Sequence, residues 1–498
     1  MDADAVVVGA GFGGLAAGAC LAKAGKQVVV IERQQGVGGN GHAFRRGAYT
    51  FDPAIHVTAR GFGIDFLEVF MQSLGIAERV ELMTADVNSA VRIAGSRFTL
   101  PTGVAAVTEY LCEQFPDDAD GVAAFMRACV QVTRESQTPP TRIAPADYAA
   151  AMAEFPALFK YRMATVADVL DEFLDDPQAK AVCGAQWPYL GLPPSRQSFM
   201  TYSGAWMALL EPGPVYPRGS FQALADAIAE VITEHGGQLL LGISVTAITA
   251  DGDGVSGVTL EDGQTISAPV VVSNADARLT FEQLLGAEHV PESLRRRLGR
   301  MKPSLSAFVL YTATTLDPSA FGLAHENFIY RHWDHDESYR ELLSGGIGGM
   351  WLSVPTAHDA DLAPAGEHIV VFGSLMPFDI GEPWKTAKPR YTELLLAELE
   401  THMPGIRDAT TFLDSASPST FHDYTLASSG GAYGWENTPN QVQPKRLSNR
   451  TPVAGLWLAG HWTNPGTGSI RCLFSGAQTA GAILGQDDAF AFLSSLAA

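Results

Sequence analysis

The sequence predicts an α/β fold in which a Rossmann-like domain is assembled from three separated pieces, with a second, α+β domain inserted between them. Strand and helix patterns alternate over residues 1–35, return after Pro217, and return again near residue 455. Such alternation is typical of a parallel sheet covered by helices. The stretches between these pieces look mostly helical at first and mixed later. The chain of 498 residues, 46% of them hydrophobic, has room for about three units of ordinary domain size.

The first piece carries a glycine turn between a strand and a helix. Ala5–Val8 is a short apolar run, as expected of a strand buried in a parallel sheet. It is followed by the run Gly9–Gly14, by a helix predicted over residues 11–24, and by a second strand over Gln27–Glu32 that ends in an acid. This order predicts the core of a Rossmann-like unit.

Gly9, Gly11 and Gly14 match the dinucleotide fingerprint G-x-G-x-x-G. In that fingerprint the first glycine permits a tight turn, the second lets the backbone approach a pyrophosphate, and the third lets helix and strand pack closely. The free N–H groups at the start of the helix favour phosphate binding. Glu32 lies 18 residues beyond Gly14, where a ribose-binding acid is expected. We therefore predict a dinucleotide site here.

A second match to the fingerprint, Gly252–Gly257, lacks this context. It lies between two predicted strands and no helix follows it, so we interpret it as a hairpin turn. The chain thus has one predicted dinucleotide site and no second site for a nicotinamide.

The remaining elements follow from hydrophobic spacing and from proline and glycine breaks. Helices are predicted over 104–129 with a break at Pro116, 165–176, 178–190, Ser198–Leu210, Phe221–Ile232, 390–402 and from Ser469, with a loop at Thr138–Thr141. Strands are predicted over Leu239–Ile248, Gly257–Leu260, Ile266–Ser273, Ala307–Tyr311, His368–Gly373 and Gly455–Ala459.

Two further glycine clusters indicate a flavin rather than a nicotinamide. Gly36–Gly41 follows the second strand directly and suits a backbone cradle that runs under a diphosphate toward a ring system. Near the C-terminus an apolar strand leads into Gly460 and then into Gly466–Ser469 at a helix start, a second position that favours negative charge. A nicotinamide domain does not need the first of these clusters, whereas a flavin site does.

Together these motifs resemble one family over nearly the whole chain. The sequence is similar to FAD-dependent oxidoreductases of the phytoene desaturase, carotenoid cis-trans isomerase and retinol saturase group. Beyond the fingerprint, the resemblance is carried by four segments in order: Gly47–His56, Tyr216–Ser220, Val272–Asp276 and Gly430–Gly434. It implies a three-piece FAD-binding domain of the glutathione reductase and amine oxidase type, with an inserted α+β substrate domain.

The resemblance also assigns residues to FAD. Gly9, Gly11, Phe12, Gly13 and Gly14 would hold the diphosphate. The resemblance places the adenosine ribose at Glu32 with Arg33 beside it, and adenine at the backbone of Val245. It places the route to the ring at Gly38, Gly39 and Asn40. The ribityl-diphosphate would lie at Gly460 and His461, and the flavin pyrimidine edge at Gly468, Ser469 and Ile470.

Catalytic side chains are harder to assign. His56 and Tyr433 carry titratable groups on segments expected near the ring, and a purely structural role competes for each of them. The cluster His332–Asp336 has no zinc-like spacing, so we predict a solvated loop and no metal site.

Charge and cysteine usage exclude several partners. The 33 lysines and arginines against 54 acids give a net charge of −21, which disfavours binding to nucleic acid. Five widely spaced cysteines indicate neither a disulfide framework nor a zinc site. Asp2 and Asp4 disfavour a signal peptide, and we interpret the uncharged run Ala5–Ala22 as strand, turn and helix rather than a membrane span. We expect a cytoplasmic protein, with peripheral contact to the inner membrane face as a hypothesis.

The predicted function is desaturation, saturation or cis-trans isomerisation of a long apolar polyene, isoprenoid or related lipid. Alternatives are an amine-oxidase-like flavoprotein, a tailoring oxidoreductase for a secondary metabolite, and a flavin-free prenyl-lipid carrier. The substrate, the reaction direction, the redox partner and the oligomeric state stay open. Predicted boundaries are 1–75, 215–290 and 441–498 for the FAD-binding domain, and 76–214 and 291–440 for the substrate domain.

Overall fold

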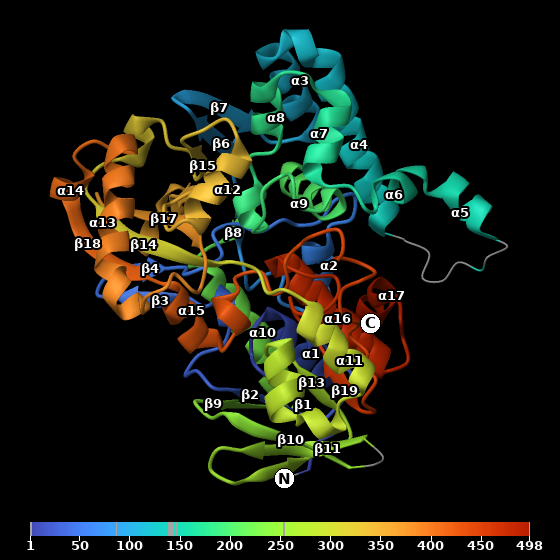
Figure 1. Cartoon of the computed structure of the whole chain (residues 1–498). Helices are drawn as coiled ribbons and strands as arrows, with labels where there is room; N and C mark the ends of the chain where they lie inside the picture. Colours follow the sequence, from blue (N-terminus) through green and yellow to red (C-terminus); the bar gives the residue numbers. More distant parts are fainter. Residues whose placement is uncertain (1, 86, 138–143, 145–146, 252–253, 498) are drawn as a thin grey trace.

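The computed structural model describes residues 2–85, 87–137, 144, 147–251 and 254–497. Its lower half in Figure 1 is built on a five-stranded sheet in the order β19-β13-β1-β2-β9, with every neighbouring pair parallel. The strands are β1 Ala5–Val8, β2 Val28–Glu32, β9 Gln238–Leu241, β13 Val271–Ser273 and β19 Leu456–Leu458. One sheet thus draws on three segments far apart in the sequence, which confirms the predicted α/β fold class.

Both faces of this sheet are covered, so its strands are apolar without alternation. On one face lie α1 Phe12–Lys23, α10 Phe221–Glu234 and α16 Ser469–Ile483. On the other face Val6, Val29 and Ile31 pack with Val258 and Leu260 of a three-stranded antiparallel sheet. That small sheet comprises β10 Val245–Asp251, β11 Gly254–Leu260 and β12 Thr265–Ser267.

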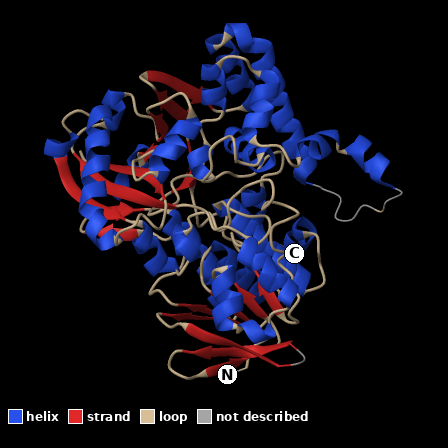
Figure 2. Cartoon of the chain, viewed as in Figure 1, coloured by secondary structure: helices blue, strands red, loops and turns tan. Residues whose placement is uncertain are grey.

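The upper half combines a large sheet with a helical group (Figure 2). The sheet has seven strands in the order β18-β14-β17-β16-β15-β6-β7, namely Thr410–Ala416, Ser306–Thr314, His368–Met376, Met350–Ser353, Glu326–Tyr330, Val87–Ile93 and Ser96–Pro101. Two small antiparallel sheets complete the fold: the hairpin of β3 Phe44–Arg46 with β4 Tyr49–Phe51, and the long-range pair of β5 Leu82–Thr84 with β8 Val215–Pro217.

The helical group follows β7 in the chain and lies at the upper right of Figure 1. It contains α3 Val104–Gln114, α4 Ala119–Gln137, α5 Tyr148–Glu154, α6 Pro156–Tyr161, α7 Val166–Phe173, α8 Pro177–Cys183 and α9 Phe199–Leu210. The remaining helices are α2 Phe66–Leu74, α11 Glu292–Arg300, α12 His335–Leu343, α13 Trp384–His402, α14 Ile406–Ala409, α15 Pro418–Thr425 and α17 Ala489–Leu496. Among the described helices, none combines the length and hydropathy needed to cross a bilayer.

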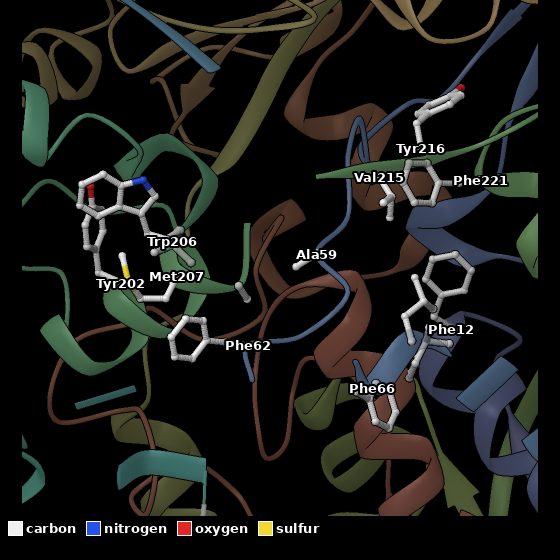
Figure 3. Packing of buried hydrophobic residues seen from close by; sticks show 14 of the residues in the cluster. Phe12, Ala59, Phe62, Phe66, Tyr202, Trp206, Met207, Val215, Tyr216 and Phe221 are labelled. Atoms are coloured by element: carbon white, nitrogen blue, oxygen red, sulfur yellow. The ribbon is translucent and has the colours of Figure 1, made fainter. Parts of the chain in front are cut away.

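A continuous core links the two halves. Figure 3 shows Ala59 on the segment between β4 and α2, with Trp206 and Met207 of α9 on one side and Phe66 and Phe221 on the other. The large sheet is packed against α13 on one face, where Phe308, Leu395 and Leu399 form a separate cluster. Its opposite face faces the centre of the molecule.

Several sequence predictions are wrong in detail. Leu239–Ile248 is not one strand, because Gly242 turns at φ 71 and separates β9 in the parallel sheet from β10 in the small sheet. Ile266–Ser273 likewise divides into β12 and β13 around Pro269, which lacks an N–H for a sheet hydrogen bond.

Two helical predictions are also corrected. The helix predicted over 178–190 ends at Cys183, and only a short 3-10 turn at Trp187–Tyr189 follows. His332–Asp336 is not wholly a solvated loop, since α12 begins at His335 and that side chain is buried. The break near Pro116 is confirmed, and the predicted loop Thr138–Thr141 lies outside the described residues.

Candidate active site

A cavity of about 420 Å³ opens at the carboxyl ends of the parallel strands. Val8 of β1, Glu32 of β2, Asn274 after β13 and His461 after β19 all line it. Ligands of open α/β sheets bind at this edge, outside the carboxyl ends of the strands. The cavity continues from there toward the seven-stranded sheet and α9, so it has a dinucleotide end and a far end.

The dinucleotide end is formed by two glycine turns in contact. Gly11 precedes the first residue of α1 and supplies no side-chain cap, so the start of the helix faces the cavity unblocked. Gly11 bridges to Gly38, and a Cβ on Gly39 would lie 2.9 Å from the Gly11 Cα. Gly9, Phe12, Gly13, Gly38, Gly39 and Asn40 line the cavity beside them.

Gly14 does not line the cavity. A Cβ on Gly14 would lie 2.0 Å from the Gly9 carbonyl oxygen, so this position requires glycine for packing. That is the role the fingerprint gives to its third glycine.

Glu32 is held in place at the end of β2. Its carboxylate accepts hydrogen bonds from the Ala10 N–H and the Gln34 N–H, both at 2.8 Å. The neighbouring Arg33 also lines the cavity, and its guanidinium donates to the carbonyls of Asp423 and Tyr424 at the end of α15. Val245 lines the same end, at the first residue of β10.

The C-terminal piece closes the cavity with a second helix start. Gly468, Ser469 and Ile470 line it where α16 begins, again without a side-chain cap. Gly468 has φ 110, and a Cβ there would meet no protein atom within 4 Å. The position is therefore open space at the start of α16, which suits a bound anion.

Gly460 lies just behind this lining. A Cβ on Gly460 would lie 2.3 Å from Asn274 Oδ1, and one on Gly13 would lie 2.5 Å from the Gly460 N. The three residues thus hold the first helix, β13 and the C-terminal segment in close contact.

Two arginines were not predicted, the buried Arg446 and the half-buried Arg471. Arg446 donates to the His461 and Tyr433 carbonyls and to Asn437 Oδ1, and burial lowers its pKa to about 9. Arg471 lines the cavity and has no hydrogen bond or ion pair to any residue that the structure describes. A signal for Arg471 was available, since it is the only formally charged residue between His461 and Asp487.

The far end is mostly aliphatic. Its lining comes from the segment after β4, from α9 and from β14, and comprises Ala54, Ile55, Val57, Ala205, Ala208, Leu209, Ala307 and Val309. Tyr189, Trp351 and Tyr433 add aromatic surface.

Both predicted catalytic residues lie in the lining of the cavity. His56 is buried, its Nδ1 has no partner among the described residues, and burial lowers its pKa to about 4, so the imidazole is neutral. The Tyr433 hydroxyl donates to the Pro188 carbonyl at 2.6 Å, and burial raises its pKa. Their participation in catalysis stays a prediction. No group of three or more His, Cys, Asp or Glu side chains in the described chain is arranged to hold a metal.

A dinucleotide-binding sheet drawn from three chain segments, with two open helix starts and a separate sheet across the cavity, defines an FAD-dependent oxidoreductase fold. The sequence model for "Flavin containing amine oxidoreductase" matches residues 12–484. The chain belongs to that family, and FAD is its cofactor.

Relatives by sequence include a phytoene dehydrogenase from Streptomyces griseus, 30% identical over 96% of this chain and 95% of its own. Prolycopene isomerase 1 from an Oncidium hybrid cultivar is 26% identical, covering 96% and 83%. All-trans-retinol 13,14-reductase from Macaca fascicularis is 24% identical, covering 92% and 82%.

Similar solved structures include an oxidoreductase from Methanosarcina mazei, with a TM-score of 0.66 at 17% identity, covering 98% of this chain and 100% of the other. Putrescine oxidase bound to putrescine has a TM-score of 0.65 at 15% identity, covering 98% and 100%. These structures share the fold of this chain.

The residues present fit FAD. The cradle at Gly11, Gly38 and Gly39 lets the backbone approach a diphosphate, and the open space at Gly468 leaves room for a ring system at the start of α16. Glu32 would meet the ribose, and Arg471 would meet the flavin pyrimidine edge.

Proposed function

We propose that this FAD-dependent oxidoreductase acts on carbon–carbon bonds of a long apolar polyene, isoprenoid or related lipid-like metabolite, by desaturation, saturation or cis-trans isomerisation. The observation that carries the proposal is the chemistry of the far end of the cavity, where aliphatic side chains such as Val57, Leu209 and Val309 face the open volume. The names of the relatives point to the same class of substrate.

FAD, when bound, supplies the exchange of a hydride with the substrate. The chain's own residues hold and orient the reactants. The glycine turns would fix the diphosphate, and the start of α16 together with Arg471 would stabilise negative charge on the pyrimidine edge. The aliphatic wall would align an extended substrate against the flavin and exclude water, so positioning would contribute to the rate.

An amine substrate is less well matched. A protonated amine is held by a carboxylate or by aromatic faces, and Tyr189, Trp351 and Tyr433 supply such faces, so the case against an amine rests on the missing carboxylate. Among the described residues, the carboxylates that line the cavity are Glu32 and Asp276, and both accept backbone N–H groups away from the aliphatic end. A secondary-metabolite tailoring reaction fits the same cavity and differs only in the substrate. The flavin-free carrier is not retained, because the family is a flavin-containing one.

Access of a lipid substrate would be served by peripheral contact with the inner face of a membrane in the cytoplasm. Large apolar side chains are exposed at Ile64, at Tyr148 and Met152 of α5, and at Met163 after α6. Flotation with liposomes tests this contact. A protein that stays entirely with the soluble fraction contradicts it.

The test of the function is anaerobic visible spectroscopy of the FAD-loaded protein. Bleaching of the oxidised flavin bands by phytoene identifies a desaturase. Reoxidation of the chemically reduced protein by all-trans-retinol or lycopene identifies a saturase, and isomerised product without a change in flavin redox state identifies an isomerase. Bleaching by primary amines, with no response to these lipids, overturns the proposal.

A further inference from the structure

A cluster of buried titratable groups lies between the far end of the cavity and the surface. His56 and Tyr189 line the cavity. Behind them lie His325 and Glu326 at the start of β15, and His358 follows β16. They come from four separate stretches of the sequence, at positions 56, 189, 325–326 and 358, and the proposed FAD contacts account for none of them.

The cluster contains an unusual share of unpaired polar atoms. Six buried side-chain atoms there make no well-directed hydrogen bond to a described residue, although some of them lie close to one another: His56 Nδ1, His325 Nδ1 and Nε2, Glu326 Oε1, Ser353 Oγ and His358 Nε2. An unpaired buried polar group costs about 1–3 kcal/mol, so such groups normally bind ordered water or serve a function. Their concentration at one place points to water bound between them.

These side chains contact one another in a continuous series. The Tyr189 hydroxyl donates to Glu326 Oε2. Glu326 Oε1 lies 3.4 Å from His325 Nε2, and the His325 and His358 rings are 3.8 Å apart between centroids. His358 is partly exposed, so this series of side-chain contacts begins at the cavity and ends at solvent.

We propose that Tyr189, Glu326, His325 and His358, with water between them, form a proton path from solvent to the far end of the cavity, and that Tyr189 exchanges the proton with the substrate. The inference rests on the proposed function and narrows it. Reduction of a C=C bond adds a hydride to one carbon and a proton to the other. The hydride comes from FAD that an external two-electron donor has reduced, and the proton comes from the Tyr189 hydroxyl. Tyr189 then regains a proton from Glu326, and solvent restores Glu326 through the histidines.

Desaturation runs the same path in reverse, and cis-trans isomerisation needs no net proton. The path therefore favours saturation or desaturation over isomerisation as the reaction of this site.

The electrostatics agree with proton transfer. Burial raises the pKa of Glu326 to about 8, so the carboxyl holds a proton near neutral pH. Burial lowers the pKa of His358 to about 4 and that of His325 as well, which leaves neutral imidazoles able to accept a proton on one nitrogen and release one from the other.

Charged groups around His358 are already paired. Tyr216 stacks on its ring and donates to Asp52, while Asp359 accepts from the Gly219 N–H and lies 3.9 Å from Arg218. None of these pairs interrupts the contacts between His358 and His325.

The test follows the Glu326 carboxyl by infrared spectroscopy of the FAD-loaded protein, without any substrate. At neutral pH we expect a C=O stretch of a protonated carboxylic acid that Glu326→Gln removes. After transfer to D2O this band shifts as the carboxyl exchanges. His325→Gln and His358→Gln should each slow that exchange at least tenfold. His335→Gln is the matched control, because His335 is a buried histidine outside the cluster, and it should leave the exchange rate unchanged.

Absence of the infrared band, or exchange that His325→Gln and His358→Gln do not slow, overturns the proton path whatever substrate the enzyme uses.

The second readout is turnover in D2O with the lipid that passes the spectroscopic test. Tyr189→Phe should lower that rate about 100-fold, within the usual range for general acid catalysis. The matched control Tyr330→Phe, a buried tyrosine bound to the Ala185 carbonyl, should stay near the parent rate. Equal rates for both variants contradict the role of Tyr189. If no lipid reacts while the band behaves as expected, the proposed function fails and the path stands.

Discussion

The two ends of the cavity are constructed differently. At the dinucleotide end the groups facing the cavity are mainly backbone atoms of glycine turns and helix starts, as at Gly11, Gly38 and Gly468. At the far end they are side chains contributed by a loop, a helix and two sheet strands, such as His56, Ala208 and Val309. A site made of backbone tolerates few substitutions at its glycines, whereas a site made of side chains sets the substrate. The predictions below test this division.

The largest effect is expected at the dinucleotide end. In Gly13→Ala the new Cβ would lie 2.5 Å from the Gly460 N and 2.6 Å from the Gly460 Cα, and both are backbone atoms that cannot rotate away. Overpacking of this kind costs about 1–3 kcal/mol, so FAD affinity should fall about tenfold to 100-fold in a fluorescence titration. Gly299→Ala in α11 is the control, because a Cβ there meets nothing within 4 Å. Affinity within threefold of the parent would show that the contact does not shape the FAD site.

At the far end, filling the cavity should change turnover and leave FAD binding intact. Ala208 is buried in α9 and lines the cavity, so Ala208→Phe places a ring in the open volume. We expect kcat/KM for phytoene to fall at least tenfold, with FAD affinity within twofold of the parent. The control is Ala105→Phe on the exposed side of α3. Equal losses of FAD and of activity would mean that the two ends are not separable.

The same division explains what the sequence predicted. Strand, glycine turn and helix are encoded by consecutive residues, so Gly9–Gly14 and Glu32 were predicted from local sequence, and Gly468–Ile470 from the glycine-rich helix start together with the family resemblance. Tyr189, Glu326 and Arg446 reach the site through long-range packing, and nothing in their local sequence marks them. The strands β6 and β7 were missed although they form a local hairpin that turns at Ala94 and Gly95, and only the parallel pairing of β6 with β15, more than 200 residues away, needed tertiary information.

The buried carboxyls of the upper half should give stability a distinct pH dependence. Folding raises the pKa of Glu326 to about 8 and that of Asp52 to about 7, so the native state binds more protons than the unfolded chain between their ordinary pKa values and these values. Stability therefore falls as pH rises through this window. Buried histidines such as His56 act in the opposite direction, but only below their ordinary pKa of 6.5.

The measurement is thermal or urea unfolding between pH 6.5 and 8, where the carboxyls act alone. Glu326→Gln should make the decline shallower by at most about 1.4 kcal/mol per pH unit. The control Glu398→Gln removes a carboxylate whose pKa is lowered by His402 and Arg331 against the effect of burial, and it should not flatten the decline. Parallel curves for Glu326→Gln and the parent protein would contradict a protonated Glu326.

The smallest effect is expected at Val245, where the dinucleotide end is predicted to use only backbone. Val245 begins β10, lies opposite Leu260 in the small sheet and lines the cavity beside Ile243 and Ser244. If its N–H and carbonyl bind adenine, Val245→Ala keeps both groups and should change FAD affinity less than threefold. Val245→Pro removes the N–H and should weaken FAD binding at least tenfold. The free energy of unfolding is measured separately, because a proline in β10 also destabilises the small sheet. Loss of affinity in the alanine variant as large as in the proline variant would show that the side chain contacts the cofactor. The contrast between backbone and side-chain recognition would then fail at this position.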